Sequence, residues 1–310
     1  MSITRFDKVK VLIAEPNREL RHEIRAMLEG FGFRKIIDTG NLGFVEKTII
    51  AEDIDLLVGD TNLPEGDLSE VIYDIRHGGL GSNPFIVTIT LTAEPCDENV
   101  SNMMKSGTDS VLVKPLNQFF FADRLQTMIQ ARKRFAVSAN YIGPDRRGKS
   151  RGSEDWNQLI AVPNPVQDKV SGQVDQVRKA RAIKATMKAI NEQRVARYGT
   201  QINILLDKIV SESPPLESSG TIRFNDVALE NLFMLGTIAH DFVRRLKGTR
   251  FITLSEMSLT LRNMTNALMA SPDRIDPEDL YIISKLGRVI QDKFARTEEE
   301  IRREELVNSK

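Results

Sequence analysis

Cysteine and histidine are scarce in this sequence, and their scarcity excludes several kinds of site. Cys96 is the only cysteine, so the chain can form no internal disulfide bond and no metal site built from cysteines alone. The three histidines, His22, His77 and His240, show no pair at the spacing of zinc ligands, so we expect no zinc site. A chain with a single cysteine suits a reducing compartment.

Long apolar runs and an excess of charge of either sign are also missing. The apolar run near the amino terminus is too short for a signal peptide or a membrane-spanning helix, and no later run is long enough. The 43 basic and 43 acidic residues balance, so no overall field attracts nucleic acid or an anionic membrane. We expect a soluble, cytoplasmic protein without membrane contact, whose 310 residues form one large or two ordinary domains.

Residues 54–67, with the sequence IDLLVGDTNLPEGD, are central to the first half of the chain. The apolar residues 56–58 predict a short strand that is buried on both faces. The run ends at Asp60, and a carboxylate directly after a buried strand lies at the edge of a sheet where open α/β folds bind ligands. Taken alone, Asp60 is as readily interpreted as a polar residue that ends a strand as it is as a ligand-binding carboxylate.

The first part of the chain alternates apolar, β-rich runs with amphipathic helical patterns. Strands are predicted at residues 9–14, 35–38, 54–59, 85–91 and 110–113, and helices at 18–30, 42–51, 68–77, 97–106 and 119–132. Five such units with short connections predict an α/β fold, a parallel sheet with helices on both faces. A flavodoxin-like strand order, 2-1-3-4-5, places the ends of the first and third strands side by side.

Four polar residues lie at the ends of these strands or just beyond them, namely Glu15, Asp60, Thr92 and Lys114. Singly, Thr92 fits a turn residue and Lys114 a solvated charge before a proline. Because the carboxyl ends of parallel strands meet at one edge of the sheet, the four together favour a shared site that suits an anion.

The segments VLIAE, LLVGDTNLP, ITLTAE and VLVKP, in this order, resemble the CheY-like receiver domain of two-component response regulators. The resemblance covers residues 9–132 and implies a receiver domain at residues 1–132. It implies that Asp60 accepts a phosphoryl group from a histidine kinase or a phosphotransfer protein. By the same resemblance Thr92 bonds a phosphoryl oxygen and Lys114 pairs with the acyl phosphate. Such a protein takes part in a phosphorelay and is not an enzyme.

The resemblance also implies a magnesium site, formed by Glu15, Asp60 and the backbone carbonyl of Asn62. The sequence departs from the family at Pro16, where a second acidic residue is usual, and at Val111, where an aromatic residue is common. Because proline offers no side-chain ligand, we expect weak Mg²⁺ binding and slow or lost phosphorylation. These departures favour an alternative function, a pseudo-receiver scaffold that binds partners without phosphorylation.

Residues 133–172 have the composition of a flexible basic linker. Glycine and proline punctuate this stretch, and it contains the basic run Arg146, Arg147, Lys149 and Arg151. The alternative interpretation is a docking arm that lies on an acidic partner or on the receiver itself.

Residues 173–310 are predicted to be helical, as an output or dimerisation region. The first helix is long, with Gly199 as a candidate break. No helix-turn-helix pattern is present, so we expect no DNA binding, but a protein partner or a homodimer through these helices. His240 faintly resembles the histidine of phosphotransfer domains. Its distance from the Leu-Lys-Gly at residues 246–248 is too long for that motif, and an ordinary helix histidine is preferred.

Overall fold

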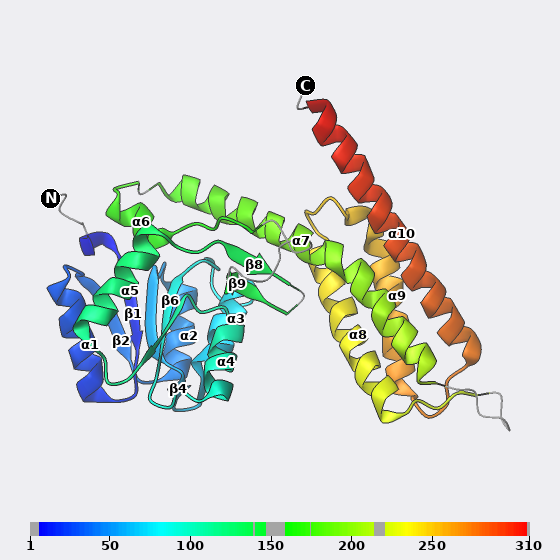
Figure 1. Ribbon diagram of the computed structural model, residues 1–310, viewed down its shortest axis with the longest axis horizontal. Coiled ribbons are helices and arrows are strands. Elements are labelled where there is room, and N and C mark those ends of the chain that lie inside the picture. Colours follow the sequence, from blue (N-terminus) through cyan, green and yellow to red (C-terminus); the bar gives the residue numbers. More distant parts are fainter. Residues whose placement is uncertain (1–5, 139, 147–158, 174, 214–220, 309–310) are drawn as a thin grey trace. The chain divides into compact units, whose positions relative to one another are not determined.

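The computed structural model describes residues 6–138, 140–146, 159–173, 175–213 and 221–308 (Figure 1). The chain divides into two compact units, Met1–Met187 and Lys188–Lys310. Among the described residues, none of the helices combines the length and the apolar character needed to span a membrane.

The first unit contains a parallel five-stranded sheet with the order β2-β1-β3-β6-β7. The strands are β1 (Lys10–Ala14), β2 (Lys35–Thr39), β3 (Leu56–Asp60), β6 (Val87–Thr92) and β7 (Ser110–Val113). The helices between and after them are α1 (Arg18–Gly30), α2 (Leu42–Ala51), α3 (Leu68–Arg76), α4 (Asp97–Lys105) and α5 (Gln118–Gln130). The short strands β4 (Asn62–Leu63) and β5 (Gly66–Asp67) follow β3 and form one antiparallel pair. The predicted α/β class and flavodoxin-like order are therefore confirmed.

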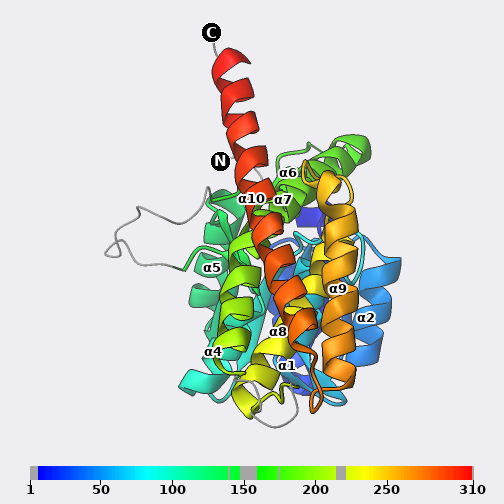
Figure 2. The same cartoon turned by 90° about the vertical axis from the view of Figure 1, so that its right-hand side faces the viewer.

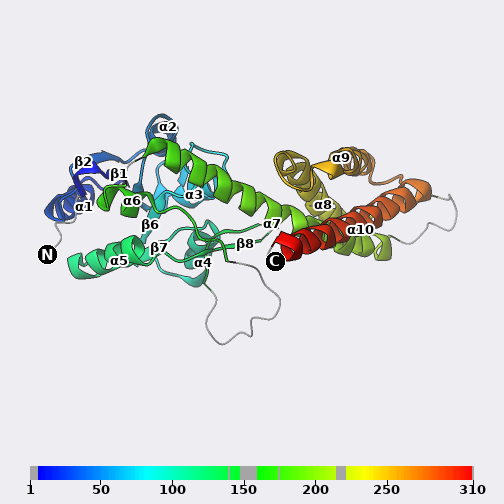
Figure 3. The same ribbon diagram turned by 90° about the horizontal axis from the view of Figure 1, so that it is seen from above.

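Alternating side chains of the strands build one core on each face of the sheet. Val11 and Ile13 of β1 pack with residues of α1 and α5, whereas Leu12 and Ala14 pack with residues of α2 and α3. The helices α1 and α5 cover one face of the sheet, and α2 and α3 cover the other (Figure 3). Because successive side chains of a strand point to opposite faces, a run that is apolar throughout is buried on both sides. The sheet is thereby covered on both faces, and its carboxyl edge brings the ends of the strands together.

Gly59 allows β3 to pack closely just before Asp60. A Cβ atom at this position would lie 2.6 Å from Cδ2 of Leu68 and 2.8 Å from Cβ of Ala14. Real Cβ contacts are not this short, so a larger residue would push β3 away from its neighbours. The glycine thus helps to fix where the carboxylate of Asp60 lies.

Residues 133–172, the connector, contain regular structure rather than the expected flexible linker where they are described. The antiparallel pair β8 (Phe135–Val137) and β9 (Ile142–Pro144) is followed by α6 (Pro165–Val170). Phe135 is fully buried, and Val166 joins the core formed by α1 and α5. The apolar residues of the connector form short runs, such as residues 135–137 and 159–162, that are separated by long polar stretches and show no helical period. The basic residues at 147, 149 and 151 lie outside the described residues.

The second unit is helical, as the sequence predicts. It contains most of α7 (Gln176–Ser211), which begins in the first unit, and α8 (Asp226–Arg245), the short helix η2 (Ile252–Leu254), α9 (Ser255–Ala270) and α10 (Pro277–Asn308) (Figure 2). The rings of Tyr198 and Phe242 join α7 to α8, and Gly199 of α7 meets Phe294 of α10. Gly199 does not break α7, because its role is to admit the ring of Phe294.

Candidate functional site

Three charged side chains meet at the carboxyl edge of the sheet. Asp60 is the last residue of β3, Glu15 directly follows β1, and Lys114 directly follows β7. The two carboxylates are neighbours because Ala14 of β1 is paired with Gly59 of β3. The Nζ atom of Lys114 lies 2.7 Å from Oε2 of Glu15 and also contacts Oδ2 of Asp60.

Backbone groups hold both carboxylates in place. The N–H of Asn62 donates to Oδ1 of Asp60 over 2.8 Å, and the N–H of Asn17 donates to Oε1 of Glu15 over 2.9 Å. Both carboxylates are buried. Each therefore offers its second oxygen to the ammonium of Lys114, and the three groups form a preorganised charged corner.

The electrostatics of this corner keep Lys114 charged. Burial lowers the pKa of Lys114, but the hydrogen bonds and charges of Asp60 and Glu15 outweigh burial and hold that pKa above its usual value. The ammonium is therefore protonated at neutral pH. One cation faces two carboxylates, so the corner retains negative charge.

Thr92 lies at the same edge, but its hydroxyl is bonded within its own loop. It is the last residue of β6, and it lies one position beyond Leu91, which is paired with Asp60. Its Oγ1 donates to the carbonyl of Glu94 over 3.2 Å and accepts from the N–H of Glu94 over 3.1 Å. The structure thus places Glu15, Asp60 and Lys114 in direct contact and Thr92 on the neighbouring strand end.

The oxygen atoms at this corner are of the kind that hard cations prefer. Oε2 of Glu15 is buried and lies against the ammonium of Lys114, with no other hydrogen-bond partner. Asp60 and the backbone carbonyl of Asn62 add carboxylate and carbonyl oxygens, which suit Mg²⁺. Among the described residues, no three His, Cys, Asp or Glu side chains lie together as a group that could hold a metal ion.

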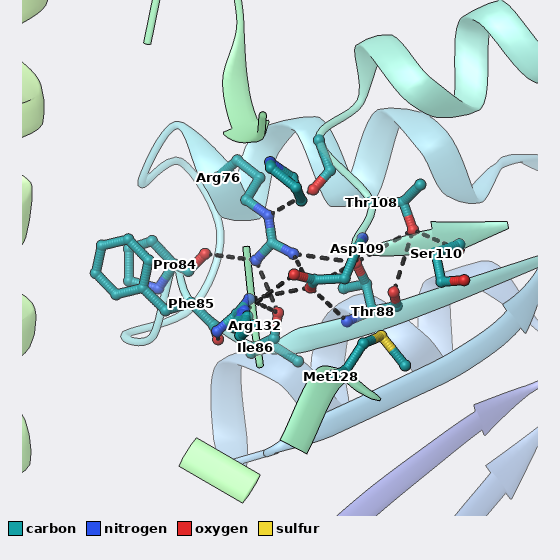
Figure 4. A network of polar contacts seen from close by, with 12 residues as sticks. Arg76, Pro84, Phe85, Ile86, Thr88, Thr108, Asp109, Ser110, Met128 and Arg132 are labelled. Carbon is teal, nitrogen blue, oxygen red and sulfur yellow. Dashed lines mark hydrogen bonds and ion pairs between the residues drawn. The ribbon is translucent and has the colours of Figure 1, made fainter. Parts of the chain in front are cut away.

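A second polar cluster, which the sequence did not reveal, lies at the opposite end of β6. The guanidinium groups of Arg76 and Arg132 both bind the carboxylate of Asp109 (Figure 4). One signal was present in the sequence, because Arg76 continues the helical face of Leu68 and Ile72, where an apolar residue is normal.

Of the other residues that the sequence singled out, His240 and Arg146 lie in the described part of the chain. His240 lies exposed on α8, and Arg146 donates to the backbone carbonyl of Thr108. Neither residue joins the corner formed by Asp60, whose described contacts come from the ends of the strands and the loops after them.

Comparison with known proteins finds a curated protein that is similar to part of this chain. No protein-family model matches the chain. The transcriptional regulatory protein RprY of Bacteroides fragilis is 25% identical over 125 residues, which are 40% of this chain and 50% of the relative. This chain therefore spans about half the length of the curated relative it matches.

The solved structures with some likeness to the chain include a receiver domain and a two-component response regulator. The receiver domain of a sensor histidine kinase from Pseudomonas aeruginosa, which holds a magnesium ion in its active-site cleft, is 24% identical, with a TM-score of 0.35. The match covers 38% of this chain and 94% of that one. A response regulator from Clostridium difficile is 22% identical, with a TM-score of 0.36, over 40% of this chain and 98% of that one.

Proposed function

We propose that Asp60 accepts a phosphoryl group. The premise is that about the first two-fifths of this chain form a receiver domain of the response-regulator family. The donor is a histidine kinase or a phosphotransfer protein. The observation that carries the proposal is the ammonium of Lys114, which contacts both Asp60 and Glu15 at the carboxyl edge of the sheet.

The transfer requires alignment and charge more than bond-making power, because the phosphoryl group moves through a loose transition state. An oxygen of Asp60 forms the new P–O bond while the P–N bond to the donor histidine breaks, and the imidazole leaves with the electron pair. The N–H of Asn62 keeps the carboxylate oriented, and Lys114 neutralises charge on the phosphoryl oxygens. The hydroxyl of Thr92 exchanges its bond to Glu94 for one to a phosphoryl oxygen.

Glu15, Asp60 and the backbone carbonyl of Asn62 would hold a magnesium ion. When bound, the ion supplies positive charge to the phosphoryl oxygens. The magnesium in the P. aeruginosa receiver supports this assignment. With a proline at residue 16, this chain offers only two carboxylates, and we expect weaker binding than three would give.

The helical second unit acts as the output or dimerisation region in this proposal. The receiver takes residues 1–132, the connector follows, and residues 173–310 form the helical region. Large apolar side chains remain exposed on this unit, such as Phe233 of α8 and Tyr281 of α10, which are 65% and 64% exposed. Exposed side chains of this kind support contact with a partner protein or with a second copy of the chain.

Phosphodonor treatment of the full chain tests this function. Incubation with acetyl phosphate and Mg²⁺ should add one alkali-labile phosphoryl group, seen by intact mass. Asp60→Asn should take up none, whereas Asp74→Asn, a change to an exposed carboxylate on α3, should behave as wild type. Equal uptake by wild type and Asp60→Asn would refute the assignment.

The second candidate is a pseudo-receiver scaffold that binds its partner without phosphorylation. Pro16 and Val111 favour it, because the first removes a metal ligand and the second is a stiff side chain without an aromatic ring. Partner binding in cells that is the same for wild type and Asp60→Asn would select the scaffold.

A further inference from the structure

A buried ionic cluster lies where α3, the start of β7 and the end of α5 meet (Figure 4). Arg76 Nη2 lies 2.9 Å from Oδ2 of Asp109, and Arg132 Nε lies 2.9 Å from Oδ1. All three side chains are nearly or fully buried. Arg76 also donates to three backbone carbonyls, those of Pro84, Ile86 and Gly107.

The charges of this cluster depend on one another. Burial raises the pKa of Asp109, but the adjacent Arg132 and Arg76 outweigh it and bring that pKa below its usual value. Burial lowers the pKa of Arg76 to about 10, so this guanidinium is still charged at neutral pH. Two cations share one carboxylate, and a shift of any member leaves a buried charge without its partner.

The connector docks directly on this cluster. The ring of Phe135 lies 5.3 Å from the guanidinium of Arg76 and 5.2 Å from that of Arg132, and it packs edge-on against Phe85. Arg132 also donates to the backbone carbonyl of Pro163 over 2.7 Å. The cluster therefore binds the connector at both Phe135 and Pro163.

Two further contacts fasten the connector near α6. The side-chain amide of Asn164 donates to the carbonyls of Met128 and Ile129, over 2.8 and 3.2 Å, at the end of α5. The ammonium of Lys169 lies 2.6 Å from Oδ2 of Asp55, which is fully buried at the start of β3. The connector is thus tied to the amino edge of the sheet, away from Asp60.

The β8–β9 pair fits tightly against the turn between α4 and β7. A Cβ atom on Gly143 would lie 2.6 Å from Cα of Gly107, so the two backbones touch. Arg146 donates to the carbonyl of Thr108 in the same turn. Close-packed surfaces leave no empty space between them, so a displacement of this turn disrupts its packing against the connector.

A chain of hydroxyl groups runs from this turn along β6 toward the phosphorylation site. Oγ1 of Thr108 lies 3.2 Å from that of Thr88 and 3.4 Å from that of Thr90, and the N–H of Asp109 donates to Thr88 over 3.0 Å. Thr88, Thr90 and Thr92 point to the same face of β6, and about 13 Å separate the first from the last. The strand β6 thus begins beside the ionic cluster, which bonds Thr88, and ends at Thr92, next to the strand end that carries Asp60.

We propose that the connector is a built-in strap that is docked while Asp60 is free and loosened when Asp60 carries a phosphoryl group. The inference rests on the proposed function, because phosphorylation supplies the signal. Movement of Thr92 toward the phosphoryl group shifts β6 and the turn at residues 106–109, and the fit to the connector is lost. The elements β8, β9 and α6 are then no longer packed against the first unit.

Hydrogen exchange of the full chain, with and without acetyl phosphate and Mg²⁺, tests this strap. Exchange of residues 135–144 and 165–170 should rise about tenfold in phosphorylated wild type, a usual size for coupling between sites. Phe135→Ala should raise their exchange without the phosphodonor. Phe44→Ala, which removes a half-exposed ring of α2, should not. If Phe135→Ala does not fold, Arg146→Ala removes a peripheral contact of the same pair and should show the same direction.

Intact mass of the same samples separates the outcomes. Phosphate on the chain with unchanged exchange in the connector overturns the strap and leaves the proposed function standing. No phosphate in wild type overturns both. Connector exchange in untreated wild type that already equals that of an unfolded peptide also overturns the strap.

Discussion

The position of Lys114 in the structure suits the role that the proposed chemistry gives it. Its ammonium contacts Asp60 and Glu15 at once, and both carboxylates are held by backbone N–H groups. A cation that is already in place need not reorganise when charge develops on the phosphoryl oxygens. The position of Lys114 should therefore affect the rate of transfer more than the fold.

Lys114→Met should slow phosphorylation of Asp60 by about a hundredfold, because a preorganised charge is removed from the transition state. The rate of acetyl phosphate uptake, followed by intact mass, measures this. Lys105→Met, a change to an exposed lysine of α4, is the matched control and should keep the wild-type rate. A rate for Lys114→Met within twofold of wild type would remove this lysine from the mechanism.

Asp241 of α8 gives the second unit a specific dependence on pH. Burial raises its pKa, but the charges of Arg245 and Arg194 and the hydroxyl of Tyr198 outweigh burial and lower the pKa to about 2. Because this value is below the usual 3.8, the ionised carboxylate stabilises the folded second unit above about pH 4, and this stabilisation is lost as pH falls through 2.

The contribution of Asp241 to the free energy of unfolding should fall by about 2 kcal/mol between pH 5 and pH 2. Circular dichroism at several pH values measures the free energy of unfolding of wild type and of Asp241→Asn. The amount by which wild type exceeds the variant should be about 2 kcal/mol smaller at pH 2 than at pH 5. A difference that does not change with pH would show that this carboxylate titrates normally in the folded state.

At the scale of elements, close contacts between helices depend on glycine. A Cβ on Gly199 would lie 2.5 Å from a ring carbon of Phe294, and the rigid ring cannot give way. A Cβ on Gly236 would lie 3.0 Å from the sulfur of Met269, which is flexible. The two glycines therefore allow a matched comparison within one bundle.

Gly199→Ala should destabilise the second unit by about 1–3 kcal/mol, because overpacking outweighs the gain in helix propensity. Gly236→Ala should cost less than about 1 kcal/mol, since the methionine can move and alanine favours the helix. Thermal unfolding followed by circular dichroism compares the variants. An equal or more stable Gly199→Ala would mean that α7 and α10 do not pack at this point.

The elements that could be predicted from the sequence are those with a strong local pattern. The strands that end at Ala14 and Asp60 contain the apolar runs at residues 11–14 and 56–58, and their end positions follow from polar residues and turns. The corner of Glu15, Asp60 and Lys114 was predictable because parallel strands end at one edge. The bond of Thr92 to Glu94 was not, because a loop can turn a hydroxyl in either direction.

The connector could not be predicted, because its docking depends on contacts that are distant in the sequence. Phe135 belongs to a short apolar run in a polar stretch, and its ring lies against Arg132 and also against Arg76 and Phe85, which are distant in the sequence. Lys169 reaches Asp55, which is 114 residues away in the chain. No window of local sequence contains both partners.

At the scale of the whole molecule, the connector extends the first compact unit beyond the part of the chain that resembles a receiver. The first compact unit extends to Met187, and α7 contributes residues to both units. A receiver cut after residue 132 would lose the buried side chains of Phe135, Ile142 and Val166. The physical domain is therefore longer than the part of the chain that resembles a receiver.

Residues 1–187 should accordingly be more stable than residues 1–132 by about 5 kcal/mol, since each buried apolar side chain contributes about 1.5–3 kcal/mol. Urea denaturation of the two fragments, followed by circular dichroism, measures the difference. Equal midpoints and slopes would show that the connector adds nothing to the receiver.

The most direct test of the central claim is to locate the phosphoryl group chemically. Borohydride reduces an aspartyl phosphate to homoserine, which peptide mass spectrometry can place in the sequence. After treatment of the full chain with acetyl phosphate and Mg²⁺, the account predicts homoserine at residue 60 and nowhere else. Homoserine at another aspartate, or a phosphoryl group carried by His240 with residue 60 unchanged, would contradict it.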